Sequence, residues 1–264
     1  MTATATMTSG AGQLPALLSR LTGDEKHAPS AHSTLDVLWV LYDRVLRVSP
    51  ATVDAPDRDR FLLSKGHGPA AYYAVLAAKG FLPVDWLDDL AGPDSRLGHH
   101  PDRVLVPGVE IGSGSLGHGL GLAVGTALGI RAQGLTGPGR PPGSPDPRVY
   151  VLLGDAELDE GANHEAIAYA GAVGLAGLTA IVVDNRSATH GWPDPGFGSS
   201  TPGPPTAGTA EPGPPSGGIA SRFTVNGWTA STVDGRDQDA LENALNGHRT
   251  DRPHVVVAVV EPKE

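Results

Sequence analysis

The most informative segment of the sequence joins an apolar run to a cluster of acidic residues: Val149-Tyr150-Val151-Leu152-Leu153-Gly154-Asp155-Ala156-Glu157-Leu158-Asp159-Glu160-Gly161. A short apolar run rich in β-branched residues predicts a strand that is buried on both faces, as in a parallel sheet. The carboxylate of Asp155 then lies at the carboxyl end of this strand, which is the edge where open α/β sheets bind ligands. The segment therefore predicts a ligand site that begins at Asp155.

A second predicted strand ends in side chains of the same kind. The apolar run 178–183 is followed by Asp184-Asn185, and Asn185 lies 185 − 155 = 30 residues after Asp155. One strand–helix–strand unit of a parallel sheet has about this length, so both side chains are expected at the same edge. Carboxylate, amide and main-chain carbonyl oxygens suit the octahedral shell of Mg²⁺, which also accepts phosphate oxygens. The alternative is that Asp155 and Asn185 only cap helices and shape turns.

Apolar and amphipathic segments continue to alternate along the chain. Short apolar runs predict strands at 149–153, 178–183, 228–233 and 255–260, and helical periodicity predicts helices at 35–46, 160–173 and 237–247. Ser33 is the predicted cap of the first helix, with Asp36 in its first turn. This order predicts an α/β fold, a parallel sheet with helices on both faces. We predict one domain over 27–264, an N-terminal tail over 1–26 and a mobile Pro/Gly-rich loop at about 193–218.

The composition restricts the class of partner and the compartment. The 19 basic and 29 acidic side chains give a formal charge of 19 − 29 = −10. This charge disfavours binding to nucleic acid or to an anionic membrane surface. The apolar segment 119–130 is much shorter than the roughly 20 residues that cross a bilayer. The chain has no cysteine, which favours a reducing compartment. We therefore expect a cytoplasmic protein with no nucleic-acid or membrane partner.

A glycine-rich segment predicts a loop that binds phosphate: Gly112-Ser113-Gly114-Ser115-Leu116-Gly117. Its glycines allow backbone amides to approach a phosphate, and a helix predicted to start near Leu116 would add its positive N-terminal end. A dinucleotide site would need a buried strand before the glycines and an acidic residue about 20 positions later. That site is disfavoured because Pro107-Gly108 interrupts the preceding run and the region 126–140 has no Asp or Glu. A zinc-protease site is excluded, because no second histidine follows His164 at the required spacing.

Five ordered segments resemble those of the transketolases, a family of thiamine diphosphate enzymes. Gly154-Asp155 and Asn185 match the two ends of the family's metal-binding segment. The other matches are Ser64-Lys65-Gly66-His67-Gly68, Gly98-His99-His100-Pro101, Pro107-Gly108-Val109-Glu110 and Gly112-Ser113-Gly114-Ser115-Leu116-Gly117-His118-Gly119. The resemblance extends in order from about residue 27 to residue 261. It implies the thiamine diphosphate-binding (PP-type) version of the α/β fold.

The resemblance also implies a site for thiamine diphosphate and Mg²⁺. It assigns Asp155, Asn185 and the main-chain carbonyl of Ser187 to the metal. It assigns His27, His67 and His100 to catalysis, and an inserted residue leaves open whether His99 or His100 matches the family position. Ala156 replaces a glycine of the family, and alanine costs about 1 kcal/mol if that position has a positive φ. The implied cofactor-binding residues are His67, Gly114, Ser115, Leu116, Gly154, Asp155, Ala156, Glu160 and Asn185.

A second polypeptide is implied as well. In transketolases a further α/β domain supplies the glutamate that activates the cofactor and most ligands of the substrate phosphate, whereas this sequence ends at Glu264. We therefore expect a C-terminal transketolase subunit with the pyrimidine-binding and C-terminal domains, in an α2β2 heterotetramer. The complex would be a transferase that moves a two-carbon ketol unit from a ketose or ketose phosphate to an aldehyde. Two alternatives are a non-catalytic transketolase-like scaffold and a subunit of another thiamine diphosphate enzyme, such as a 2-oxo acid decarboxylating component.

Overall fold

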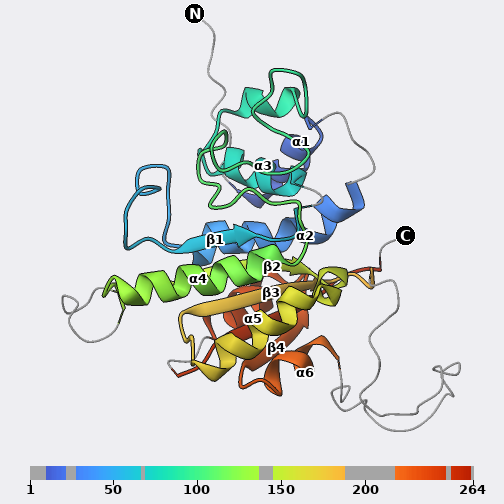
Figure 1. Cartoon of the computed structure of the whole chain (residues 1–264). Helices are drawn as coiled ribbons and strands as arrows, with labels where there is room; N and C mark the ends of the chain where they lie inside the picture. Colours follow the sequence, from blue (N-terminus) through green and yellow to red (C-terminus); the bar gives the residue numbers. More distant parts are fainter. Residues whose placement is uncertain are drawn as a thin grey trace, which may run out of the picture.

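A parallel β-sheet forms the centre of the protein (Figure 1). The computed structural model describes residues 10–21, 28–66, 69–136, 145–187, 218–247 and 251–262. Within these residues the sheet has five strands in the order β1-β2-β3-β5-β4, and all neighbouring strands are parallel. This arrangement confirms the predicted α/β fold. The strands are β1 (Arg60–Leu63), β2 (Val149–Gly154), β3 (Leu178–Asp184), β4 (Thr229–Asp234) and β5 (His254–Val259).

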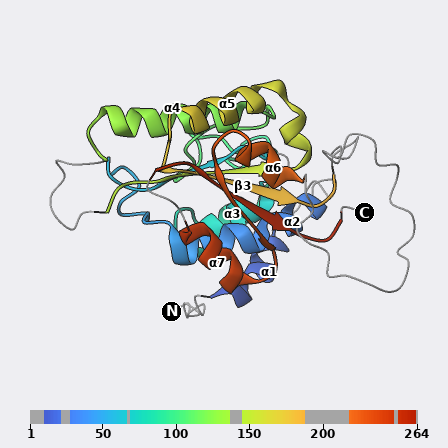
Figure 2. The same cartoon turned by 90° about the horizontal axis from the view of Figure 1, so that it is seen from below.

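Helices cover both faces of the sheet (Figure 2). One face is covered by α4 (His118–Ala132), α5 (Gly161–Ala172) and α6 (Ile219–Thr224). The opposite face is covered by α1 (Leu14–Leu18), α2 (Ala28–Val40), α3 (Ala70–Ala78) and α7 (Gln238–Asn246). Each face has its own apolar core, because alternate side chains of a strand point to opposite faces. Single helical turns are η1 (Ala11–Gln13), η3 (Leu41–Val45), η4 (Val84–Asp88) and η5 (Ala156–Asp159).

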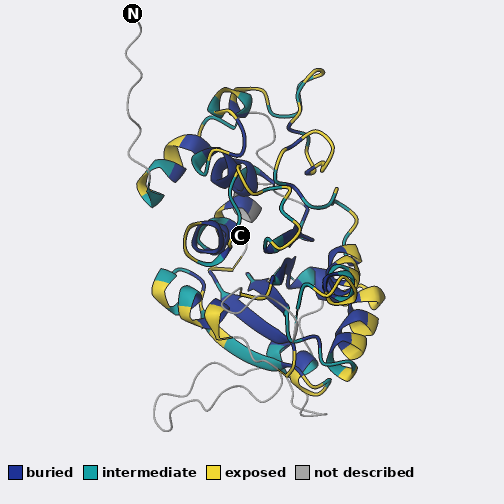
Figure 3. Ribbon diagram, turned by 90° about the vertical axis from the view of Figure 1, so that its left-hand side faces the viewer, coloured by how far each residue is buried: buried dark blue, intermediate teal, exposed yellow. Residues whose placement is uncertain are grey.

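The buried strands bring the predicted metal-site residues together. All residues of β2 are buried, and in β3 only the last residue is partly exposed. Figure 3 shows this buried sheet between helices whose outer faces are exposed. Pairing places Gly154 opposite Val183, so Asp155 and Asn185 follow their strands at the same edge. The predicted strand–helix–strand unit is therefore confirmed. Among the described helices, none has the length and apolar character needed to cross a membrane.

Three segments near the N-terminus differ from the sequence prediction. Helix α2 begins at Ala28, so Ser33 lies inside the helix and does not cap it. Leu14 and Leu17 of α1 are buried in the core, so part of the predicted tail packs on the domain. Strand β1 was not predicted, because its apolar run of three residues is too short to identify. The predicted loop at 193–218 lies outside the described residues, apart from Gly218.

Three tyrosines of η3 and α3 are buried in the core. The hydroxyls of Tyr42 and Tyr72 lie 3.0 Å apart and share a hydrogen bond. Tyr72 donates to the carbonyl oxygen of Gly108 at 3.2 Å, and Tyr73 donates to that of Gly98 at 3.0 Å. Burial raises the pKa of all three hydroxyls above its ordinary value. The fold therefore keeps these tyrosines protonated at a pH where exposed tyrosines ionise.

The contribution of these three tyrosines to the free energy of unfolding should be complete below about pH 10 and should fall above it. An unfolded tyrosine ionises at about pH 10, so a raised pKa in the fold gives stability that is complete below this pH and lost above it. One pH unit higher, each such tyrosine lowers the free energy of unfolding by about 1.4 kcal/mol. Urea unfolding across this pH range measures the effect. In Tyr72→Phe the free energy of unfolding should fall less steeply with pH above pH 10, because one fewer proton is lost on unfolding. Equal slopes in the wild type and the variant would contradict the prediction.

Candidate functional site

The loops that follow β1, β2 and β3 meet at the carboxyl edge of the sheet. These three strands are parallel neighbours, so their carboxyl ends lie side by side. Ser64, Asp155 and Asn185 are the first residues after the three strands, and all three are buried. Buried polar side chains need hydrogen-bond partners from the protein or from a ligand. This edge is therefore the candidate functional site.

Asp155 holds the loop that follows β3. Its Oδ2 accepts a hydrogen bond from the backbone N–H of Ser187 at 2.6 Å, and its Oδ1 accepts one from Ser187 Oγ at 2.5 Å. The backbone N–H of Asp155 donates to the carbonyl oxygen of Val183 at 3.1 Å. The loop after β3 is therefore folded back on the end of β2, and the backbone of Ser187 lies beside the Asp155 carboxylate.

Asn185 provides a second oxygen at this edge. Its side chain is 3% exposed, and its Oδ1 has no hydrogen-bond partner within the described residues. A buried amide oxygen without a donor is costly, and a cation would remove that cost. No group of three or more His, Cys, Asp and Glu side chains in the described part of the chain suits a metal ion. The oxygens at this edge are the Asp155 carboxylate, which also accepts hydrogen bonds from Ser187, and the Asn185 amide oxygen. Hard oxygen donors of this kind fit Mg²⁺ that takes its remaining ligands from phosphate and water.

The chain reverses direction between Asn185 and Ser187 through an unusual backbone conformation. Arg186 has a φ of 53°, in the left-handed region that residues other than glycine rarely adopt. Its backbone N–H donates to Asp184 Oδ1 at 3.2 Å. A residue in this conformation costs about 1 kcal/mol. The strain is localised in the turn that brings Ser187 back to Asp155.

Substitutions at Arg186 should separate backbone strain from side-chain contacts. Arg186→Val should lower the free energy of unfolding by about 1–2 kcal/mol, because a β-branched residue fits the left-handed region poorly. Arg186→Gly should be at least as stable as the wild type, because glycine adopts positive φ without steric cost. Arg186 is exposed, so both variants lose few side-chain contacts. Urea unfolding therefore measures mainly the cost of the left-handed backbone conformation at this residue. A valine variant as stable as the glycine variant would contradict the assignment of strain.

Two glycines allow two loops to meet backbone to backbone. A Cβ atom on Gly66 would lie 2.4 Å from the backbone nitrogen of Gly114. A Cβ atom on Gly114 would lie 2.9 Å from Cγ of His100, and Gly114 has a φ of 133°. Glycine is therefore required at both positions. The residues at 64–66 and 112–117, which we call the β1 loop and the glycine loop, together form one wall of the site.

His100 lies against both loops of this wall. Its Nδ1 is 2.8 Å from the carbonyl oxygen of Gly66. Because a carbonyl oxygen only accepts, Nδ1 carries the proton and Nε2 is the acceptor in the neutral imidazole. His99 and His100 are both exposed, and His100 contacts Gly66 and Gly114. His27 and His67, the other two predicted catalytic residues, lie outside the described residues.

A buried carboxylate that was not predicted from the sequence lies beneath the wall. Glu157 is 2% exposed, and its Oε1 accepts hydrogen bonds from Ser64 Oγ and, at 2.9 Å, from the backbone N–H of Gly117. Its Oε2 accepts a hydrogen bond from the backbone N–H of Gly154 at 3.3 Å. Burial raises the pKa of Glu157 above its ordinary value, and the hydrogen bonds from these three residues only partly offset that rise. Glu157 thus contacts all three segments of the candidate site.

The N-terminus of α4 already binds a carboxylate of the protein. Gly117 is the cap residue, with a φ of 86° and no side chain, and its N–H donates to Glu157. The N–H of Gly119 donates to Ser64 Oγ at 3.0 Å. These two amides are therefore not free to bind a diphosphate. The helix begins at His118, two residues after the predicted start, and a role of its N-terminal end in binding phosphate stays a prediction.

The remaining predicted cofactor residues surround this position. Gly114, Ser115 and Leu116 precede the helix in the glycine loop, and Ser115 is exposed. Ala156 begins η5, and among the described non-glycine residues only Ala91 and Arg186 have positive φ. The cost expected for alanine in a left-handed conformation therefore does not arise.

Glu160 follows η5 and lies against the glycine loop. Its Cβ is 2.6 Å from the position that a Cβ atom on Gly117 would take. Glu160 itself is exposed. The absence of a side chain at Gly117 therefore allows the segment after β2 to pack closely on the glycine loop.

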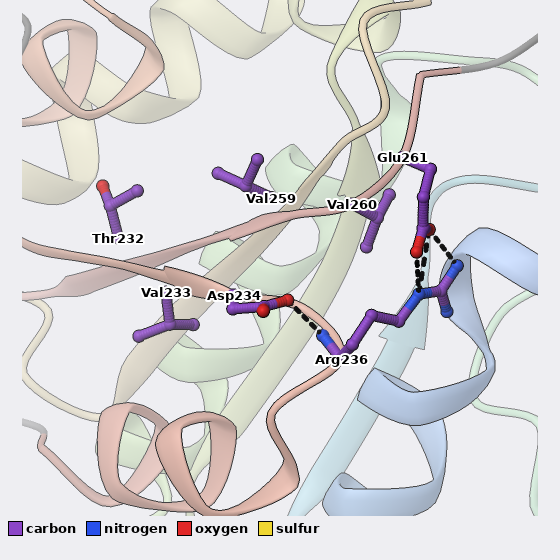
Figure 4. Close-up of a pocket in the computed structure, with 7 residues that line it drawn as sticks. All are labelled: Thr232, Val233, Asp234, Arg236, Val259, Val260 and Glu261. Atoms are coloured by element: carbon purple, nitrogen blue, oxygen red, sulfur yellow. Dashed lines mark hydrogen bonds and ion pairs between the residues drawn. The ribbon is translucent and has the colours of Figure 1, made fainter.

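An open cavity of about 530 Å³ lies further along the same edge, at the ends of β4 and β5 (Figure 4). Among the described residues that line it, none is a predicted site residue. Its most prominent side chain, Arg236, makes ion pairs with Glu261 at 2.6 Å and with Asp36 of α2 at 2.9 Å. Arg236 therefore connects α2 to the segment after β5, and we assign it a structural role.

Comparisons with known proteins identify the family to which the chain belongs. Residues 22–203 match the family described as transketolase, thiamine diphosphate binding domain. The chain is 50% identical over 247 residues to a protein named ferredoxin fas2 from Rhodococcoides fascians, a match that covers 94% of this chain and 71% of that protein. It is 39% identical over 161 residues to one subunit of the apulose-4-phosphate transketolase from Actinobacillus succinogenes. This match covers 61% of this chain and 54% of that protein.

The fold is similar to that of solved transketolases. The transketolase from Pichia stipitis in complex with sedoheptulose 7-phosphate superposes with a TM-score of 0.72 at 26% identity. The superposition covers 95% of this chain and 36% of that chain. The chain therefore spans about a third of a complete transketolase and about half of the apulose-4-phosphate transketolase subunit. This similarity confirms the predicted thiamine diphosphate-binding version of the α/β fold.

Proposed function

Because the chain belongs to the transketolase family through its thiamine diphosphate-binding domain, we propose that it is the cofactor-binding subunit of a split transketolase. It binds thiamine diphosphate and Mg²⁺ and, with a C-terminal partner subunit, transfers a two-carbon ketol unit from a ketose or ketose phosphate to an aldehyde. The observation that supports this most directly is the arrangement of Asp155 and Asn185. A buried carboxylate lies at the same strand edge as a buried amide oxygen without a donor, which suits a metal that binds phosphate.

In this proposal Asp155, Asn185 and the main-chain carbonyl of Ser187 hold Mg²⁺. The absence of side chains at Gly66 and Gly114 lets the β1 loop and the glycine loop lie together beside the cofactor. When bound, thiamine diphosphate supplies an electron sink for breaking and forming the bond next to a ketose carbonyl. The Nδ1 of His100 is held by Gly66, and its Nε2 can accept a hydrogen bond or a proton from a substrate hydroxyl. His27 and His67 keep their predicted catalytic roles as part of the proposal.

The partner and the substrates are inferred from relatives. One relative is named as a single subunit of a transketolase, and this chain covers 54% of it. We propose that a C-terminal subunit supplies the pyrimidine-binding and C-terminal domains in an α2β2 assembly, and that the substrates are sugars or sugar phosphates. A cytoplasmic location is part of the same proposal. Although one relative is named a ferredoxin, the proposed function does not include an iron–sulfur cluster held by cysteine, since these 264 residues contain no cysteine.

Reconstitution tests this function. The chain is expressed with the polypeptide encoded beside it that matches the remaining transketolase domains. With thiamine diphosphate and Mg²⁺, the mixture should convert a ketose phosphate and an aldose phosphate into the ketol-transfer products, and neither polypeptide should do so by itself. A confirmed complex that binds no cofactor would support the scaffold alternative. Release of CO₂ from a 2-oxo acid without ketol transfer would support a different thiamine diphosphate enzyme.

A further inference from the structure

Glu157 connects three segments of the candidate site that are far apart in the sequence. Ser64 belongs to the β1 loop, Gly117 ends the glycine loop and Gly154 ends β2, and each donates a hydrogen bond to the Glu157 carboxylate. The backbone of Glu157 is held separately, because Asn163 Nδ2 of α5 donates to its carbonyl oxygen at 2.7 Å. A single side chain thus contacts all three segments, in addition to the backbone hydrogen bonds that join the β1 loop to β2.

A carboxylate is the group that fits these contacts. Both of its oxygens accept, so it can receive one hydroxyl and two backbone N–H groups at once. Its negative charge also suits the N-terminus of α4, where the N–H of Gly117 lies. Glutamine would present an NH₂ group to one of the donors. Aspartate is one methylene shorter and would not reach all three.

The contacts of Glu157 are adjacent to the residues proposed to bind the cofactor. Gly66 lies two residues after Ser64, and its N–H donates to the Ser64 carbonyl oxygen at 2.7 Å. Gly114 lies three residues before Gly117, and Asp155 directly follows Gly154. The carboxylate is therefore at the point where the wall of the site joins the metal-binding loop.

We propose that Glu157 is a positioning residue that holds the β1 loop, the glycine loop and the end of β2 in the arrangement that binds thiamine diphosphate with Mg²⁺. This inference rests on the proposed function, since it names a residue that prepares the cofactor site. Loops held in their binding arrangement lose less conformational freedom when a ligand binds, so binding is tighter. Loss of the carboxylate should weaken cofactor binding although Glu157 acts only through other residues.

Glu157→Gln tests the proposal with little change in volume. Calorimetric titration of thiamine diphosphate, with Mg²⁺ in excess, into the complex with the partner subunit should show about tenfold weaker binding, the loss expected for a charged hydrogen bond. Glu157→Asp should not restore the affinity. The matched control is Asp159→Asn, which removes a carboxylate that is 47% exposed in the same helical turn and should leave the affinity unchanged.

Hydrogen exchange of the chain without cofactor gives a second measurement, which depends neither on catalytic activity nor on cofactor binding. In Glu157→Gln the amides of Gly117 and Gly154 should exchange about tenfold faster, whereas those of the strand centres should stay unchanged. A general loss of protection would mean that the variant only destabilises the fold. An unchanged affinity for the cofactor would overturn the proposal, whatever the exchange rates.

The two hypotheses fail in different ways. If the wild-type complex binds no thiamine diphosphate, the proposed function fails and the proposal for Glu157 fails with it, even if the glycine loop becomes more mobile in the variant. If the wild type binds the cofactor and Glu157→Gln binds it equally well, only the proposal for Glu157 fails. Weaker binding together with faster local exchange at Gly117 supports both.

Discussion

Asp155→Ala is expected to weaken the binding of thiamine diphosphate with Mg²⁺ by at least about 100-fold, or roughly 2.7 kcal/mol, and to abolish ketol transfer. Asp155 is the only carboxylate in the proposed metal shell, and it also holds Ser187 through two hydrogen bonds. The alanine variant loses the negative charge that binds Mg²⁺ and the contact that keeps the loop after β3 in place. Calorimetric titration of the cofactor at several Mg²⁺ concentrations measures both effects, because a lost metal ligand shifts the Mg²⁺ dependence.

Two variants separate the roles of this residue. Ser187→Ala keeps the Asp155 carboxylate and the main-chain carbonyl and removes only the hydroxyl contact, so it should reduce affinity far less than Asp155→Ala. Asp159→Ala removes an exposed carboxylate nearby and should have no effect. Circular dichroism confirms that each variant is folded. If Asp155→Ala binds the cofactor with the affinity of the wild type, Asp155 is not a metal ligand, and the edge of β2 and β3 has another function.

The sequence was sufficient to predict the part of the sheet edge formed by β2 and β3, because these two strands are long and apolar. All residues of β2 are buried, and Asn185 follows Asp155 at the spacing of one strand–helix–strand unit. Local periodicity was less reliable at the first helix. There Ser33 matches the preference for a helix cap, but the helix begins at Ala28 and Ser33 is buried inside it.

The inner part of the site could not be predicted, because it depends on contacts between distant segments. Glu157 belongs to an acidic cluster in which Asp159 and Glu160 are exposed, and nothing in the local sequence shows that Glu157 turns inward. Its burial depends on Ser64, which lies 93 positions away. Arg186 gives no indication of a left-handed turn either, because that conformation is usually marked by glycine or asparagine.

At Ala156 the sequence predicted a possible backbone strain that the structure does not have. Glycine at this position in the family suggested that alanine would strain the turn. In the structure Ala156 begins the short helix η5, where alanine fits without a positive φ. Ala156 therefore gives no support to the scaffold alternative, and the distinction between enzyme and scaffold depends on cofactor binding itself.

Gly66→Ala should be the most damaging small substitution in the wall of the site. The new methyl group would lie 2.4 Å from the backbone nitrogen of Gly114 and 2.8 Å from its Cα, and no rotation of a side chain can relieve a contact with backbone. The β1 loop and the glycine loop must then separate. We expect the free energy of unfolding to fall by about 2–3 kcal/mol, as for an overpacked core, and cofactor affinity to fall by about tenfold or more.

Gly12→Ala is the matched control, because it adds the same methyl group where no atom lies within 4 Å. It should change the free energy of unfolding by less than about 0.5 kcal/mol. Urea unfolding and calorimetric titration of both variants compare the two positions directly. If Gly66→Ala lowers stability but binds the cofactor normally, the contact between the two loops serves the fold alone. If both quantities fall together, the close contact at Gly66 supports cofactor binding as well as the fold.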